Sequence, residues 1–198
     1  YEVANSCRFD GSSTNLLRTN SNETTTKITF SVWVKRGALG GTQRIFSADG
    51  NDYMVFRFES SNAFRFFINI YGVAESTITT NRLFRDVSAW YHLVVTWDST
   101  QSTAADRIKL WVNGTQETSF SASNYPAEDQ TTTAINNTSA NAFNIGRYQQ
   151  NDNEHFNGYM AEAVIATSQA LAPTDFGEFD EDSPTIWKPK DVSGLTFG

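Results

Sequence analysis

The sequence predicts an all-β protein built as a two-sheet antiparallel sandwich. Short segments with alternating apolar and polar residues recur along the chain, and clusters of Gly, Asn, Asp, Ser and Thr separate them. Helical periodicity is nearly absent, and only one short helical turn is expected, near residues 173–178, where Pro173 can begin it. A chain of 198 residues can bury roughly 70% of its unfolded surface, so one domain over residues 1–198 is expected.

The strongest strand pair is expected in residues 90–114. In its second strand Ile108, Leu110 and Val112 alternate with polar or amphipathic residues, which is the period of a half-buried antiparallel strand. The dipeptide Asn113-Gly114 then supplies the two residues that a tight hairpin turn requires. This segment therefore predicts one strand pair and a second hairpin directly after it.

Similar alternating segments predict the remaining strands. They cover residues 3–9, 16–18, 28–35, 44–48, 53–59, 63–71, 74–79, 115–120, 142–147 and 158–166. In the hairpin over residues 53–71, Phe56 and Phe66 are expected in the core, whereas Arg57, Arg65 and Phe67 are expected to point outward. Residues 121–140 are expected to form a long polar loop, and residues 178–198 an irregular tail packed on the domain.

Composition excludes one class of partner. The net charge is −7, with 22 acidic and 15 basic residues, whereas nucleic-acid binding requires a basic surface. No apolar run is long enough to span a bilayer, so membrane insertion is not expected either. The single cysteine, Cys7, cannot form an intramolecular disulfide and is expected to be a small buried residue.

The order of motifs in residues 90–114 also carries a family resemblance. A strand, Trp97-Asp98, a Ser/Thr-rich loop, a second strand and Asn113-Gly114 resemble the laminin-G and concanavalin A-like jelly rolls. The blocks at residues 30–37, 144–147 and 156–162 are similar to other blocks of that family, in the same order. The closest resemblance is to the versions found in fibre or spike proteins of tailed bacteriophages. It implies a jelly-roll fold, although that fold hosts lectins, glycosidases and adhesion modules alike.

Five residues are candidates for sugar binding. Trp33, Tyr71 and Trp111 fall opposite the inferred core positions of their strands, where aromatic rings can stack on sugar C–H faces. Asp49 and Asn51 lie in a compact acidic turn that offers hydrogen-bonding oxygens. The alternative is that the C-terminal tail or a neighbouring subunit covers these outward-facing aromatic residues.

The family resemblance implies a candidate calcium site. Laminin-G modules that bind Ca²⁺ use an acidic residue just before a strand and another oxygen donor in a late loop. Here Asp52 immediately precedes the strand over residues 53–59, and Asn151, Asp152 and Asn153 lie in a late loop. Their oxygens are the ligands that this hard cation prefers. The alternative is that these residues only form turns.

Catalysis has little support in the sequence. Residues 178–182, Glu-Phe-Asp-Glu-Asp, superficially resemble the Glu-x-Asp-x-(x)-Glu motif of a jelly-roll glucanase family, but the last Glu is missing. The two histidines, His92 and His155, are not accompanied by a Gly-x-Ser-x-Gly motif. We therefore expect a solvated acidic segment here and no enzyme.

Together these features predict a non-enzymatic binding module that recognises a glycan on the bacterial host surface. By the family resemblance, it would belong to a phage-type fibre or spike at the extracellular surface of a virion or particle. Its partners would include other particle subunits, with a homotrimer considered from family habit. The alternative is a structural decoration or connector domain that binds no sugar, and a glycoside hydrolase is a third hypothesis.

Overall fold

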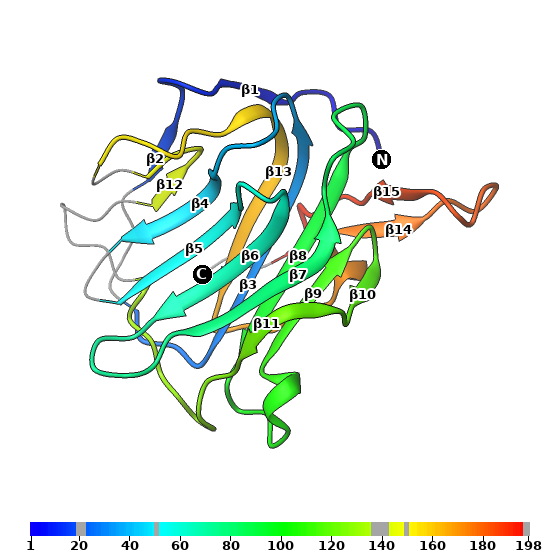
Figure 1. The fold of residues 1–198 in the computed structure, drawn as a ribbon. Coiled ribbons are helices and arrows are strands. Elements are labelled where there is room, and N and C mark those ends of the chain that lie inside the picture. The colour runs from blue at the N-terminus through cyan, green and yellow to red at the C-terminus, as the bar shows by residue number, and fades with distance from the viewer. Residues whose placement is uncertain (19–22, 50–51, 136–142, 149–150, 196–198) are drawn as a thin grey trace.

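Two antiparallel sheets pack face to face in this computed structural model, which describes residues 1–18, 23–49, 52–135, 143–148 and 151–195 (Figure 1). One sheet has six strands, in the order β1 (Cys7–Asp10), β13 (Asn157–Thr167), β3 (Lys27–Arg36), β8 (Tyr91–Asp98), β9 (Ile108–Val112) and β10 (Thr115–Glu117). The other has seven, in the order β11 (Phe120–Asn124), β7 (Ser76–Leu83), β6 (Ala63–Asn69), β5 (Tyr53–Phe58), β4 (Gln43–Asp49), β12 (Phe143–Ile145) and β2 (Leu16–Arg18). The predicted sandwich is confirmed.

Aromatic side chains fill the space between the two sheets. Phe30 of β3 lies 4.4 Å, between ring centroids, from Phe56 of β5, and Phe56 lies 4.8 Å from Phe66 of β6. Leu110 of β9 is fully buried on the opposite side of the same core. Phe56, Phe66 and Leu110 were expected inside from the alternation of their strands, and aromatic pairs at such distances add to the stabilisation from burial.

Short 3₁₀ turns are the only helical elements in the described part of the chain. One, η2 (Pro173–Asp175), lies where the helical turn was expected. The other, η1 (Ala104–Asp106), lies between β8 and β9, where the sequence predicted only a polar loop. Among the described residues no helix is long and apolar enough to cross a membrane.

The segment after β10 leaves its sheet and joins the other one. Residues 115–120 were expected to complete one hairpin, but β10 ends at Glu117 and Phe120 begins β11, which pairs with β7. The Asn81 backbone N–H donates to the Ser119 carbonyl at 3.0 Å and guides this crossing. Part of the predicted polar loop is therefore an edge strand.

The C-terminal segment is more ordered in structure than expected. Residues 178–198 were expected to be irregular, but β14 (Gly177–Phe179) and β15 (Trp187–Pro189) pair as a hairpin that extends from the sandwich (Figure 1). Trp187, the first residue of β15, packs on Gly114. Each strand has three residues, which is too short for an alternating pattern to predict it.

The expectation for Cys7 is wrong, because its side chain is exposed. Cys7 begins β1, which lies at the edge of its sheet and has β13 as its one neighbour among the described strands. Phe9, two residues later on the same face, is fully buried. The alternation was correct, but Cys7 lies where the interior between the sheets opens to solvent.

Candidate functional site

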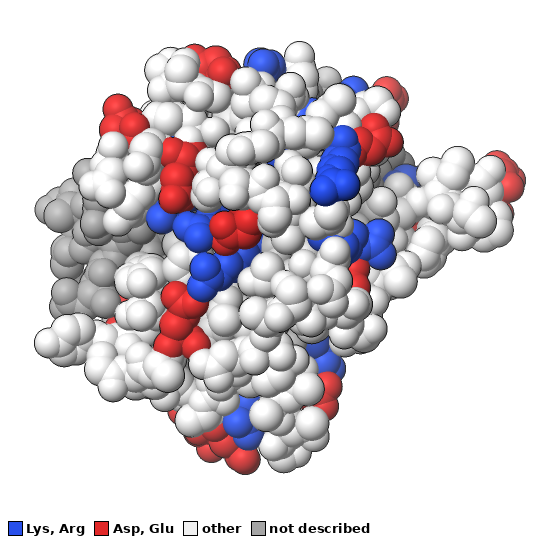
Figure 2. All heavy atoms as spheres, viewed as in Figure 1, with Lys and Arg blue, Asp and Glu red and all other residues white. Residues whose placement is uncertain are grey.

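The outer face of the seven-stranded sheet carries three arginines in direct cross-strand register. Arg44 of β4 is opposite Arg57 of β5, which is opposite Arg65 of β6. We call these three residues the arginine ladder. Figure 2, which has the viewpoint of Figure 1, shows basic side chains gathered over the middle of this face with acidic ones beside them. Like charges directly opposite each other destabilise a sheet, so this arrangement needs compensation.

Carboxylates provide that compensation. The glutamates that pair with the ladder are Glu59, Glu75 and Glu154. Arg44 Nε lies 2.5 Å from a Glu154 oxygen, and Arg57 Nε lies 2.9 Å from a Glu59 oxygen. Glu154 also lies 3.5 Å from Arg57 Nη1, while Arg65 pairs with Glu75. Three positive and three negative groups therefore form a nearly neutral network of alternating donors and acceptors.

Aromatic rings support the guanidinium groups. Arg57 and Arg65 lie over the Phe67 ring, at 5.2 and 4.5 Å from its centroid. Arg44 lies 3.7 Å from the centroid of Tyr148. These cation–π contacts hold the arginines in place. The side chains of Arg57 and Arg65 keep 16% and 27% exposure, so a ligand can reach their N–H groups.

Glu154 has a strained backbone, with a φ of +54°. Residues other than glycine rarely adopt this conformation, which costs on the order of 1–3 kcal/mol and is often found at functional sites. The Glu154 carbonyl accepts a hydrogen bond from the Arg44 backbone N–H at 2.8 Å, which fixes the strained residue beside the ladder. This backbone conformation therefore places the Glu154 carboxylate between Arg44 and Arg57.

Two of the predicted sugar-binding residues belong to this region. Asp49 of β4 pairs with Tyr53 of β5, and Tyr53 pairs with Asn69 of β6. These three residues lie at one end of the sheet that carries the ladder. Tyr71 follows β6 at that end and is 82% exposed. Asn51 lies outside the described residues. The structure therefore brings the backbone of Asp49 and the ring of Tyr71 to the rim next to the ladder.

Trp33 and Trp111 belong to the other sheet. Trp33 is only 7% exposed and stacks on His92, with ring centroids 4.6 Å apart. The indole N–H of Trp187, in the C-terminal hairpin, donates to His92 Nδ1 at 2.8 Å, so the tail covers this face. Trp111 is partly buried in β9. These two residues do not share a surface with Tyr71.

His92 is a structural residue. Because its Nδ1 accepts the Trp187 hydrogen bond, the ring proton is on Nε2, which donates to Ser31 Oγ at 2.8 Å. The side chain is fully buried, and this burial lowers the pKa of His92 to about 3. The imidazole is therefore neutral at physiological pH and links the tail to the sheet.

Asp52 connects loops within the protein. Its Oδ1 accepts the Tyr71 backbone N–H at 2.9 Å, and its Oδ2 accepts the backbone N–H and hydroxyl of Thr133, each at 2.8 Å. Thr132 Oγ1 is 3.4 Å from Oδ2. Burial alone would raise the pKa of Asp52, but these hydrogen bonds outweigh it and leave the pKa lowered. The carboxylate is ionised and engaged on both oxygens.

The late loop with Asn151, Asp152 and Asn153 has a different protein partner, Arg147. Asp152 Oδ1 accepts a hydrogen bond from Arg147 Nη1 at 2.6 Å, and Asn151 and Asn153 are exposed beside it. Among the described residues no three His, Cys, Asp or Glu side chains form a group that could hold a metal ion. Asp52 and Asp152 therefore have different hydrogen-bond partners within the protein, Thr133 and Tyr71 for the first and Arg147 for the second.

The acidic segment at residues 178–182 lies on the projecting hairpin. Asp180 and Glu178 both pair with Lys188, at 3.2 and 3.7 Å. The hydrogen bond from Lys188 lowers the pKa of Asp180, whereas a general acid requires a raised pKa. These exposed, paired carboxylates lack the arrangement that glycoside hydrolysis needs.

The ladder itself was only partly visible in the sequence. Alternation placed Arg57 and Arg65 outside, beside Phe67. The role of Arg44 depends on the register between β4 and β5, and the role of Glu154 depends on a loop that reaches the sheet from far along the chain. The signal in the sequence was the pair Arg57 and Arg65 at outward positions beside Phe67.

The family follows from this fold and from a sequence match. Residues 10–175 match the model of the concanavalin A-like lectin/glucanases superfamily, in its laminin-G form. The chain belongs to this superfamily. No curated protein sequence matches the chain.

Solved structures share the fold at low identity. A heptameric pentraxin from Limulus polyphemus is 15% identical, with a TM-score of 0.58, over 83% of this chain and 76% of that one. Domain 4 of an arabinanase from Geobacillus stearothermophilus, in complex with arabinotriose, is 20% identical, with a TM-score of 0.58, over 85% and 73%. Tailspike protein 2 of Escherichia coli O157:H7 bacteriophage CAB120 is 10% identical, with a TM-score of 0.55, over 88% of this chain but 24% of that chain.

Proposed function

We propose that this chain is a non-enzymatic module that binds a glycan on the outer face of its seven-stranded sheet. The observation that carries the proposal is the arginine ladder, whose guanidinium groups alternate with glutamates above Phe67. Arginine only donates hydrogen bonds, and an ionised glutamate only accepts them. A sugar hydroxyl does both, so the mixed network is suited to a polyhydroxylated ring.

The charge balance favours a neutral glycan. A site for a strongly anionic ligand would leave its arginines without carboxylates, but each ladder residue has a glutamate within 3 Å of one nitrogen. An incoming hydroxyl can share these partners without leaving a buried charge unpaired. The exposed ring of Tyr71 at the rim can extend the surface by stacking on a further sugar unit.

The biological setting is part of the proposal. We place the module at the extracellular surface of a phage-type fibre or spike, in which copies assemble as a trimer and recognise a glycan of the bacterial host. Support comes from the fold, which is shared with the arabinanase domain solved with arabinotriose and with the phage tailspike. The arginines and glutamates of the ladder supply the hydrogen bonds themselves, so binding at the ladder is proposed to need no metal ion.

A glycan-array screen followed by calorimetry tests the proposal. A neutral oligosaccharide should bind, and the double variant Arg57→Gln/Arg65→Gln should weaken it at least about tenfold, because each charged hydrogen bond contributes roughly 1.5–3 kcal/mol. The matched control is Arg8→Gln, since Arg8 also lies over an aromatic ring, that of Tyr159, but in the other sheet. Its affinity should stay within about twofold of the unchanged protein.

Three outcomes would overturn the proposal. If no glycan on the array binds, the chain would instead be a structural decoration or connector domain. Co-assembly with other particle subunits would then support that role. Release of shorter sugars during incubation, detected by mass spectrometry, would identify a hydrolase. Equal loss of affinity in Arg8→Gln would show that the ladder is not the binding surface.

A further inference from the structure

The two sheets do not close against each other along one edge of the sandwich. β1 pairs with β13 only as far as the Cys7–Met160 pair, although β13 continues to Thr167. A bulge between Ala161 and Val164, with Glu162 at a φ of +49°, interrupts the regular course of β13 there. The facing edge strand, β2, has three exposed residues. The apolar interior is therefore reachable from solvent along this edge.

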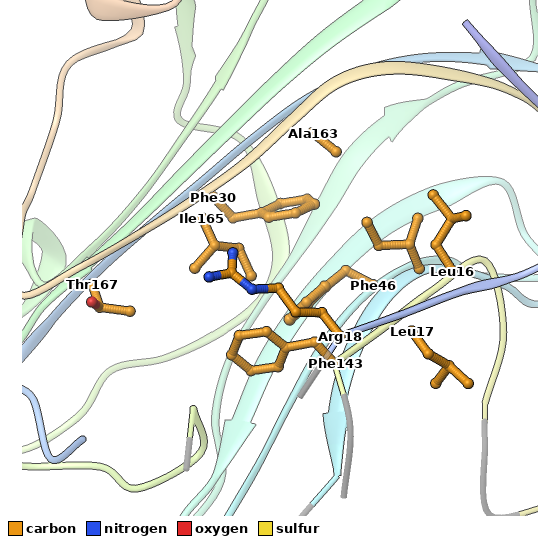
Figure 3. Close-up of a pocket in the computed structure, with 10 residues that line it drawn as sticks. Leu16, Leu17, Arg18, Phe30, Phe46, Phe143, Ala163, Ile165 and Thr167 are labelled. Atoms are coloured by element: carbon orange, nitrogen blue, oxygen red, sulfur yellow. The ribbon is translucent and has the colours of Figure 1, made fainter. Parts of the chain in front are cut away.

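A cavity of about 150 Å³ lies between the sheets at this edge (Figure 3). It is lined by Leu16, Phe30, Phe143, Ala163 and Ile165, among others. An engineered apolar cavity of about this size in another protein binds benzene, so the volume is sufficient for a small apolar group.

A second cavity continues the first along the edge. It has a volume of about 300 Å³ and shares Leu16, Ile145 and Ala163 with the first cavity. Its further lining includes Cys7 and Met160. The two cavities therefore form one elongated groove with an apolar middle at Leu16, Ile145 and Ala163, and its length suits a linear chain better than a compact ring.

The two ends of the groove differ in their polar groups: the second cavity includes Asn5, Ser6 and Glu162, whereas the first includes Thr167 and Arg18. The pairing of Thr167 with Ile28 in β3 places it on the inner face of the sheet. Thr167 is 5% exposed, and in the described part of the chain its hydroxyl has no hydrogen-bond partner, which is costly for a buried polar group. Arg18 extends from β2 across the mouth toward the same end (Figure 3). A hydroxyl and a cation therefore lie together beside an apolar channel.

We propose that this groove binds an alkyl carboxylate. The carboxylate would accept hydrogen bonds from Arg18 and Thr167, and the chain would run past Ile165 and Ala163 toward Cys7. Guanidinium pairs strongly with carboxylate, and the apolar chain removes the exposed lining from water. This site is on a different edge from the arginine ladder and does not depend on glycan binding.

Calorimetry with octanoate, decanoate and dodecanoate, each below its micelle concentration, tests the proposal. Affinity should rise about fourfold per added methylene until the groove is filled, which is the effect of burying one CH₂ group. The single cysteine provides a second measurement, because a chain that reaches Cys7 should slow its alkylation by iodoacetamide. Dodecanoate should slow alkylation more than octanoate at equal saturation. No binding by any of the three, or affinity independent of chain length, would overturn the proposal.

Variants separate the two ends of the groove. Arg18→Gln should weaken octanoate about tenfold and leave 1-octanol within about twofold, whereas the control Arg85→Gln, an exposed arginine elsewhere, should change neither. Ile165→Phe should weaken both ligands by filling the cavity, and Ala163→Phe serves if the first variant does not fold. Unchanged octanoate binding in Arg18→Gln, or in both filling variants, would refute the assigned site.

Discussion

Burial of neutral His92 should make the protein lose stability in mild acid. The pKa of His92 is lowered from 6.5 to about 3 in the folded state, and the ordinary value returns on unfolding. Between these values the unfolded chain binds one more proton than the folded chain, so the free energy of unfolding falls as the pH falls. Each pH unit corresponds to about 1.36 kcal/mol. From pH 7 to pH 5 the loss should therefore be about 2 kcal/mol.

Urea unfolding followed by tryptophan fluorescence at the two pH values measures this loss. His92→Gln should lower stability at pH 7, because the contacts with Trp187 and Ser31 change, but its free energy of unfolding should then vary little between pH 7 and pH 5. The control His155→Gln retains His92 and should keep the slope. The lowered pKa values of Asp52 and Asp98 act only below their ordinary value of 3.8, outside this window. Parallel losses in the unchanged protein and His92→Gln would refute the reasoning.

Three further predictions concern the packing and charge of other residues. Gly114→Ala should lower the free energy of unfolding by about 2–4 kcal/mol, because Gly114 has a φ of +75° and a Cβ there would meet the Trp187 ring. The control Gly72→Ala has a similar φ of +77° but open space around it, so it should lower the free energy of unfolding by only about 1–2 kcal/mol. Equal losses in urea unfolding would show that the contact between Gly114 and the tail is weak. Asp52→Asn should lower the free energy of unfolding by about 2 kcal/mol, since one oxygen no longer accepts the Thr133 hydrogen bonds. The control Asp106→Asn, at a half-buried residue that forms an ion pair with Lys109, should lower it by under about 0.5 kcal/mol, and no loss in Asp52→Asn would contradict its linking role. The melting temperature should be the same in EDTA and in Ca²⁺, and a rise with calcium would indicate a metal site that uses residues outside the described set.

The core could be predicted because alternation alone separates inside from outside in a half-buried strand. Phe56, Phe66 and Leu110 follow that rule, and all three are buried. The same rule placed Trp33 outward, which is correct for its own sheet, but it cannot show what covers that face. The covering hairpin carries Trp187, and its three-residue strands leave no periodic signal.

The candidate site was less predictable because it depends on register and on distant loops. Arg44, Arg57 and Arg65 meet only when three strands align, and Glu154 joins them from more than a hundred residues away along the chain. For Asp52 a local pattern suggested a role, but the partners of its carboxylate come from distant parts of the chain. Its position before a strand suggested a cation ligand, whereas the structure satisfies it with Thr133 and Tyr71, whose proximity no local pattern reveals.

The most direct test of the central claim is to locate a bound oligosaccharide by NMR. Side-chain Nε–H signals of arginine report hydrogen bonding at individual guanidinium groups. Titration with the tightest array ligand should shift the signals of Arg57 and Arg65 in a saturable way and leave that of Arg8 unchanged. Shifts confined to the indole signals of Trp33 and Trp90, which line a cleft of about 310 Å³ on the other sheet, would contradict the account.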